Sequence, residues 1–143
     1  MDLQRFVEAQ DAPAGGMTVY EHALAELRAG AKRTHWMWFV FPQLEGLGFS
    51  ALARRYAIAG LEEAKAYLAH PVLGPRLRAC VAAANAIEGR SAREVMGSPD
   101  DLKLRSSLTL FAEAAEDAAD FRAALDRYYG GEPDSATLQR LGW

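Results

Sequence analysis

The sequence predicts an all-α fold: a single compact domain of about eight short helices that covers residues 1–143. The chain contains 28 Ala and 17 Leu but only 6 Val, 2 Ile and 4 Thr, so residues that favour helices far outnumber the β-branched residues that strands prefer. Its glycines and prolines fall mostly between segments in which apolar residues recur at helical spacing, as expected at helix ends. With 143 residues, 50% of them apolar, the chain can bury one core without a disulfide or a metal.

Capping residues mark where the helices begin. Asp2 is the expected N-cap of the first helix, which ends before the loop 11–16. Thr18 and Glu21 have the spacing of a capping box, and Gly30 suits the C′ position of that second helix. By the same signals, further helices are expected from Ser50 through Ile58, over 61–69, from Pro75 at the first helical position to Gly89, from Ser91 to Gly97, from Pro99 through Ala115, over 121–128 and after the cap Asp134.

One segment, residues 35–41, is apolar on every side. It reads His-Trp-Met-Trp-Phe-Val-Phe and is followed by Pro42. A lone strand would leave its backbone groups unpaired, and the sequence offers no second convincing strand. We therefore expect a buried short helix or extended stretch inside the helical domain.

The polar residues around this segment make it the first candidate for a binding site. Lys32 follows a helix-ending glycine and is expected at the domain surface, where its charge can meet an anion. Tryptophan rings can stack on a base or a cation, and Gln43 can recognise a polar edge. Aromatic rings in such an apolar run belong to the core more often than they contact a ligand. The polar residues Lys32, His35 and Gln43, taken as a group, favour a binding site. The residues concerned are Lys32, His35, Trp36, Trp38 and Gln43.

A second group of polar residues lies on the helix expected to begin at Pro99. Lys103, Ser106 and Ser107 are spaced to share one side of that helix. Two explanations account for the serines on this helix. Their hydroxyls can bond back to the carbonyl four residues earlier, or they can contact a polar ligand. Lys103 and Ser107 are expected to border a cleft. The neighbouring stripe, expected to face the core, is Leu104, Leu108 and Phe111.

The charge distribution favours an anionic partner near the aromatic segment. The whole chain has a net charge of −3, but residues 28–55 hold five basic residues against one acidic residue, and the remainder of the chain is acidic. The overall acidity argues against binding of duplex nucleic acid. Single-stranded nucleic acid is a weaker hypothesis for the same reason.

Missing patterns exclude several classes of protein. The three histidines and the single cysteine, Cys80, show no metal-ligand spacing, and the common nucleotide fingerprints are absent, so we expect no metal and no cofactor. No apolar run approaches the roughly 20 residues needed to span a bilayer, and the charged N-terminus does not resemble a signal peptide. We expect a cytoplasmic protein without membrane contact, and the sequence identifies no protein partner.

Motifs along nearly the whole chain match those of one bacterial family. The most specific is the tryptophan-rich run from Lys32 through Leu44, followed by Gly46-Leu47-Gly48. The chain resembles domain-of-unknown-function family 1810, whose members form a compact multihelical domain and have no established activity. The resemblance implies the same fold here, and its motif positions include the candidate site residues. Further matches are Leu3-Gln4-Arg5-Phe6, Tyr56-Ala57-Ile58, His70-Pro71, Lys103-Leu104 and Ser106-Ser107 with Thr109-Leu110-Phe111.

Two hypotheses of function follow. In the first, a pocket between residues 32–43 and the helix bearing Lys103 binds a small anionic, nucleotide-like or sugar-phosphate-like ligand. If the protein is a hydrolase, His35 is the candidate general base. In the second, the protein is a non-enzymatic interaction module whose basic rim docks an acidic partner. A polar-lined cleft at His35 and Lys103 would favour the first hypothesis, and fully buried tryptophans without a cleft the second. The candidate ligand-binding residues are Lys32, His35, Trp36, Trp38, Gln43, Lys103, Ser106 and Ser107.

Overall fold

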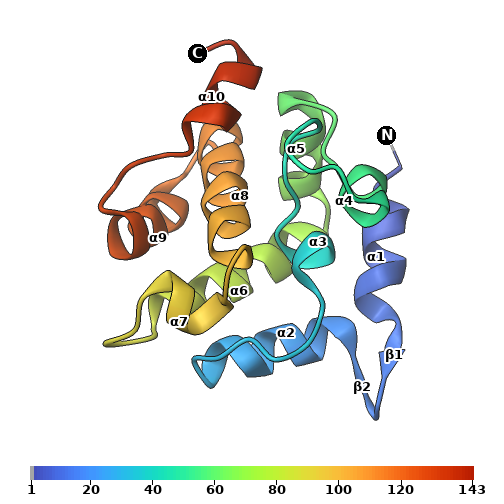
Figure 1. Ribbon diagram of the computed structural model, residues 1–143. Coiled ribbons are helices and arrows are strands. Elements are labelled where there is room, and N and C mark those ends of the chain that lie inside the picture. Colours follow the sequence, from blue (N-terminus) through green and yellow to red (C-terminus); the bar gives the residue numbers. More distant parts are fainter. Residues whose placement is uncertain (1) are drawn as a thin grey trace.

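The computed structural model describes residues 2–143, which form ten helices and one short hairpin (Figure 1). The fold is compact and mostly α-helical, which confirms the predicted fold class. The helices are α1 (Gln4–Asp11), α2 (Val19–Arg28), α3 (Met37–Val40), α4 (Ala51–Arg55), α5 (Leu61–Ala69), α6 (Leu73–Asn85), α7 (Ala92–Met96), α8 (Asp100–Ala114), α9 (Ala119–Tyr129) and α10 (Ser135–Leu141).

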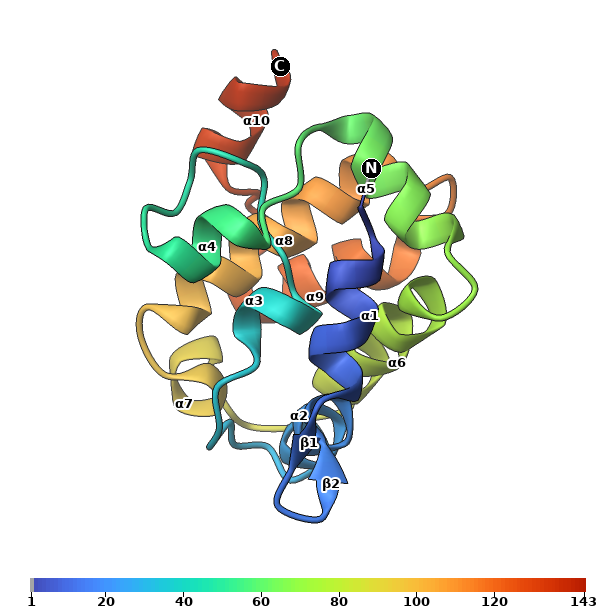
Figure 2. The ribbon, with the colours of Figure 1, turned by 90° about the vertical axis from the view of Figure 1, so that its right-hand side faces the viewer.

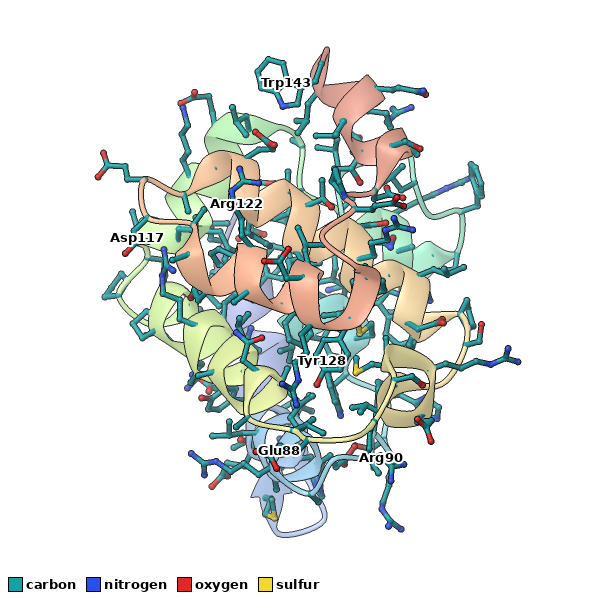
Figure 3. All side chains as sticks on the ribbon, turned by 90° about the vertical axis from the view of Figure 1, so that its left-hand side faces the viewer. Glu88, Arg90, Asp117, Arg122, Tyr128 and Trp143 are labelled. Atoms are coloured by element: carbon teal, nitrogen blue, oxygen red, sulfur yellow. The ribbon has the colours of Figure 1, made fainter. Side chains whose placement is uncertain are left out.

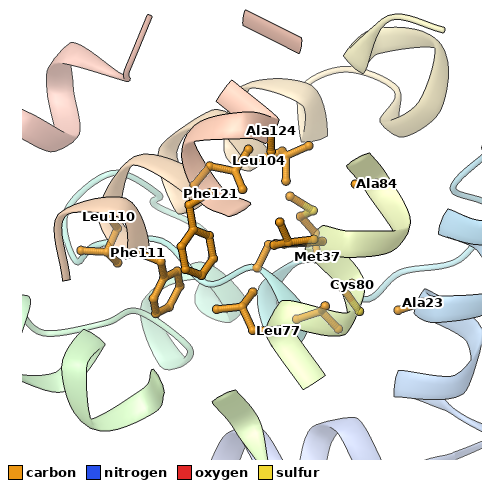
Figure 4. Packing of buried hydrophobic residues seen from close by; sticks show 14 of the residues in the cluster. Ala23, Met37, Leu77, Cys80, Ala84, Leu104, Leu110, Phe111, Phe121 and Ala124 are labelled. Carbon is orange, nitrogen blue, oxygen red and sulfur yellow. The ribbon is translucent and has the colours of Figure 1, made fainter. Parts of the chain in front are cut away.

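Helix α8 lies in the middle of the fold, with α5, α7, α9 and α10 packed around it (Figure 1). The predicted stripe Leu104, Leu108 and Phe111 is buried. Phe111 stacks beside Phe121 of α9, with ring centroids 6.1 Å apart, as the close view of the core shows (Figure 4). Every residue from 106 to 112 is also buried, because neighbouring helices cover α8 on more than the one side that the apolar stripe predicts.

The local capping signals hold. Thr18 and Glu21 form the predicted capping box at α2, and Ser91 and Glu94 form the second at α7. Asp134 accepts a hydrogen bond from the backbone N–H of Thr137 and so caps α10. Each of these motifs satisfies N–H groups that the first turn of a helix leaves free.

The helix predicted from Ser50 through Ile58 is wrong at its end, because α4 stops at Arg55. Ser50 does cap it. Tyr56 forms a turn after Arg55, and Ile58 then pairs with the backbone of Gln43 and Glu45 through hydrogen bonds of 2.8 Å. The guanidinium of Arg5 bonds the carbonyls of Arg55 and Ala57. These distant groups replace the hydrogen bonds that a longer helix would make.

Three predicted helix starts are shifted. Leu3 rather than Asp2 takes the cap position of α1, and α8 begins at Asp100, one residue after the predicted Pro99. Helix α6 begins at Leu73 instead of Pro75, because the Nδ1 atom of His70 accepts hydrogen bonds from the N–H groups of Val72 and Leu73. The side chain of His70 therefore caps a helix that the position of Pro75 alone would start too late.

The loop after α1 contains the hairpin of β1 (Pro13–Ala14) and β2 (Met17–Thr18). Gly15 and Gly16 connect the strands, with φ angles of 63° and 88°, as a two-residue type I′ turn requires. The remaining described chain is helix and connecting loop. Within residues 2–143, no helix has the length and apolar character that crossing a bilayer requires.

Two faces of the molecule differ in what covers α8. On one face, α3 and α4 lie in front of α8, and the segment between them extends toward α10 (Figure 2). On the opposite face α9 covers the core, with Asp117 and Arg122 at its surface (Figure 3). On the first of these faces, α3, the segment after it and α8 carry Trp38, Gln43 and Lys103, which line one cavity.

Candidate ligand-binding site

A buried carboxylate, Glu26 of α2, holds the start of the aromatic segment. Its Oε1 atom accepts hydrogen bonds from the backbone N–H groups of Arg33 and Thr34 at 2.6 and 2.9 Å and from the Trp36 indole at 3.0 Å. Its Oε2 atom accepts from the Thr34 hydroxyl at 2.7 Å. Burial favours the neutral acid, but the four hydrogen bonds together outweigh it and lower the pKa of Glu26 to about 2. Glu26 is therefore an ionised anchor for residues 33–36.

Beyond this anchor, each tryptophan of the segment lies beside a lysine. The Lys32 Nζ is 5.0 Å from the centre of the Trp36 ring, and the Lys103 Nζ is 5.1 Å from that of Trp38, within the range of a cation–π interaction. One carboxylate joins the two pairs: Asp100 lies 2.9 Å from Lys32 and 3.6 Å from Lys103. The segment 32–38 is thus fastened to the start of α8.

The predicted surface position of Lys32 is wrong. Only 7% of its side chain is exposed, because Nζ is held by Asp100 and by the carbonyl of Thr34, at 2.7 Å. Its backbone N–H also donates to the carbonyl of Val95, at 2.7 Å. The charge of Lys32 is neutralised by Asp100 in the interior. Of the two lysines, Lys103 is therefore the one that remains available to a ligand.

Two spaces are lined in part by Lys103. The first is a small cavity of about 10 Å³, which accommodates a single water-sized group. The second is an open groove of about 290 Å³. Gln43 and Lys103 line both. The other residues of the cavity are Met37, Trp38, Phe41, Ala53 and Tyr56, and those of the groove are Leu47, Gly48, Pro99, Leu102, Ser106, Asp134 and Ala136.

The polar groups of the cavity are unequally satisfied. The Trp38 Nε1 atom is buried and has no hydrogen-bond partner among the described residues. The backbone of Gln43 is fixed, because its carbonyl accepts from the N–H of Ile58. Trp38, Gln43, Tyr56 and Lys103 are the residues with polar groups that line this space.

Loop and helix contacts give the groove its shape. Arg140 of α10 donates to the carbonyl of Glu45 at 2.7 Å, and its guanidinium occupies the space where a side chain at Gly46 would lie. Gly48 packs against Ala53, and a Cβ atom at Gly48 would come within 2.6 Å of that methyl group. These contacts hold the 43–48 loop against α10 and α4.

The structure brings together only part of the predicted site. Gln43 and Lys103 line the groove, as does Ser106, whose hydroxyl donates to the carbonyl of Leu102 or to Asp134, each at 3.2 Å. Trp38 lines the cavity. The prediction that Lys103 borders a cleft is confirmed.

Other predicted residues lie elsewhere. Trp36 is fully buried and bonded to Glu26, so it has no free face for stacking. Ser107 is also fully buried, contrary to its predicted place at the cleft, and Ser106 lines the groove instead. His35 is exposed and lies outside the lining of the cavity and the groove.

The predicted basic rim is dispersed over the surface. Arg28 lies beside the alanines of α6, whereas Arg54 borders a depression with Gly46 and Phe49. Lys32 is paired in the interior. The positive charges of residues 28–55 therefore do not converge on one face.

Two acidic residues of the site were missed. Asp100 and Asp134 read as helix-start residues in the sequence, and that signal is correct. Asp134 also lines the groove, and Asp100 pairs with Lys32 and Lys103. Glu26 was missed as well. Its position in α2, seven residues before Arg33, carries no sequence signal of the hydrogen bonds that it accepts.

Comparisons with known proteins agree with the resemblance seen in the sequence. The family described as "Protein of unknown function (DUF1810)" matches residues 1–141. The chain belongs to this family. A crystal structure of the conserved hypothetical protein Rv1873 from Mycobacterium tuberculosis matches this DUF1810 chain with 57% identity and a TM-score of 0.93, over 99% of this chain and 97% of that chain. No curated protein matches. For a DUF1810 protein the function has to be argued from the site itself.

Proposed function

We propose that this DUF1810 protein binds a small anionic ligand at the cavity and groove beside Lys103, with an oxygen atom of the ligand in the cavity. The observation that carries the proposal is the buried Trp38 Nε1–H, which lacks a partner within residues 2–143. A buried donor without an acceptor costs about 1–3 kcal/mol. Trp38, Gln43 and Lys103 line the cavity, so we assign the missing acceptor of this N–H to a ligand oxygen bound there.

The dimensions favour a ligand that is larger than its anionic end. The cavity holds one oxygen atom, and the groove of about 290 Å³ holds the rest, close to the lower limit of about 300 Å³ for small-molecule sites. Since Lys103 lines both spaces, it can pair with the charge wherever the two join. His35 lies outside both, so the proposal concerns binding and not hydrolysis.

Titration followed by ¹⁵N-NMR of the indole groups tests this proposal. The chain has three tryptophans: Trp36 is buried and bonded to Glu26, Trp143 is 64% exposed at the end of the chain (Figure 3), and Trp38 lines the cavity. Benzoate and phenyl phosphate serve as anionic probes, and benzamide as the neutral probe. We expect at least one anion to move the Trp38 signal selectively and benzamide to leave it unchanged.

A matched pair of lysine variants locates the charge. Lys103→Met removes the ammonium group at the site and keeps an apolar stem. It should weaken binding of the anionic probe on the order of tenfold, because one charge-assisted hydrogen bond is lost. Lys65→Met removes the same charge from an exposed lysine that pairs only with Glu62, and it should have no effect. The proposal is overturned if neither anion moves the Trp38 signal, or if both lysine variants weaken the probe equally.

A further inference from the structure

The charges beside the groove nearly cancel. Asp100 pairs with Lys32 and Lys103 together, so these three groups carry a net charge of only +1. Asp134 adds a second carboxylate to the groove wall. Its Oδ2 atom accepts from the N–H and the hydroxyl of Thr137. A monoanion meets one uncompensated ammonium here, whereas the second negative charge of a dianion meets two carboxylates.

The remaining walls are apolar. Leu47, Pro99 and Leu102 line the groove, and Leu102 is 59% exposed. Met37 and Phe41 line the cavity. Apolar surface left open beside a charged group favours a ligand whose anionic end is attached to an apolar body, since burying both surfaces removes them from water.

Building on the proposed function, we propose that the site selects small monocarboxylates with an apolar body over phosphate esters, and that Asp100 is the residue that determines this selectivity. A carboxylate places one oxygen in the one-atom cavity and the other near Lys103 in the groove. A phosphate ester has three terminal oxygens and carries a charge of about −1.5 to −2 at neutral pH. It would leave charged oxygens facing Asp100 and Asp134.

Benzoate and phenyl phosphate compare the two classes on one aromatic body. At pH 7.5 and low salt, we expect wild-type protein to bind benzoate on the order of tenfold more tightly than phenyl phosphate, measured by the Trp38 indole signal. Asp100→Asn removes one negative charge at the site and should reduce that preference on the order of tenfold, as expected for a charge a few ångströms from the ligand.

Asp101→Asn is the matched control. It makes the same change of charge one residue further along α8, at a carboxylate that, among the described residues, pairs with neither Lys32 nor Lys103, and should keep the preference for benzoate. If Asp100→Asn does not fold, judged by the Trp36 indole signal, Asp134→Asn replaces it, because asparagine can still cap α10. That variant should also reduce the preference.

The outcomes separate the two proposals. Equal or tighter binding of phenyl phosphate by the wild type overturns the selectivity and leaves the proposed function standing. If the folded variant, Asp100→Asn or its replacement Asp134→Asn, keeps the wild-type preference for benzoate, the role of the acidic groups is overturned. If neither ligand moves the Trp38 signal, the proposed function itself fails.

Discussion

Replacing Glu26 by glutamine isolates the charge of the buried anchor from its hydrogen bonds. Three of the four donors around the carboxylate meet the Oε1 atom, and only the Thr34 hydroxyl meets Oε2. A glutamine oxygen at the Oε1 position keeps those three bonds, and its NH₂ group can donate to the oxygen of the Thr34 hydroxyl. Glu26→Gln therefore removes the charge with little change of shape, whereas Glu26→Ala removes both.

The magnitude follows from the pKa of Glu26, which the hydrogen bonds lower from 4.5 to about 2 despite its burial. At about 1.4 kcal/mol for each pKa unit, ionisation of Glu26 contributes on the order of 3 kcal/mol to the free energy of unfolding. Because the folded pKa is depressed, this contribution is complete above pH 4.5 and is lost as the pH falls toward 2. About 2 kcal/mol of it should be gone at pH 3.

Urea unfolding of wild type and Glu26→Gln at pH 7 and pH 3 measures the effect. The difference in unfolding free energy between the two proteins should be about 3 kcal/mol at pH 7 and about 1 kcal/mol at pH 3. Glu62→Gln, at an exposed residue of α5, should differ little from wild type at pH 7. A Glu26→Gln difference that does not change between the two pH values would refute the assignment of Glu26 as an ionised anchor.

Three further predictions concern the core around α8. Phe111→Ala removes a fully buried ring and should lower the free energy of unfolding in urea by about 3–5 kcal/mol. Ser106→Ala removes a bonded hydroxyl and should cost about 1 kcal/mol, whereas Ser107→Ala removes a buried hydroxyl with no partner in the described chain and should be neutral or stabilising; a cost at Ser107 equal to that at Ser106 would show a bonded hydroxyl there. Cys80 should resist thiol reagents at pH 8 until the protein unfolds, because burial raises the pKa of its thiol to about 12; rapid labelling of the folded protein would contradict this.

The parts of the fold that the sequence predicts well are those that depend on neighbours in the chain. The capping boxes at Thr18 and Ser91 each join two residues three positions apart, and both are present. The stripe from Leu104 to Phe111 likewise depends on the spacing of one helix. Such signals need no knowledge of the rest of the fold.

Helix ends that depend on distant groups could not be predicted. The end of α4 is set by Arg5, which is 50 residues from Arg55 in the sequence, and by the backbone of Gln43, which lies in the segment before the helix. The start of α6 was predictable in principle, because His70 lies just before it, but a histidine cap is a weaker signal than a proline. The buried polar side of α8 depends on which helices surround it.

The candidate site shows the same division. Residue type identified Lys103, Gln43 and Trp38, whose side chains do share one cavity. It could not show that Lys32 is held in the interior whereas Lys103 lines the groove, since both are lysines. The carboxylate of Asp100, which lies far from Lys32 in the sequence, is closer to Lys32 than to Lys103 by 0.7 Å.

The position of Asp100 also separates the structural and binding roles of the tryptophan-rich motif. The side chains of Lys32 and Trp36 are held in the interior, so substitutions there should be read first as changes of stability. Trp38 and Lys103 form the second lysine–tryptophan pair, and both line the cavity. Because the two pairs share one carboxylate, a ligand that draws Lys103 away from Asp100 leaves that carboxylate to Lys32 alone. On the proposed function, binding at the groove and anchoring of the aromatic segment depend on the same acidic side chain.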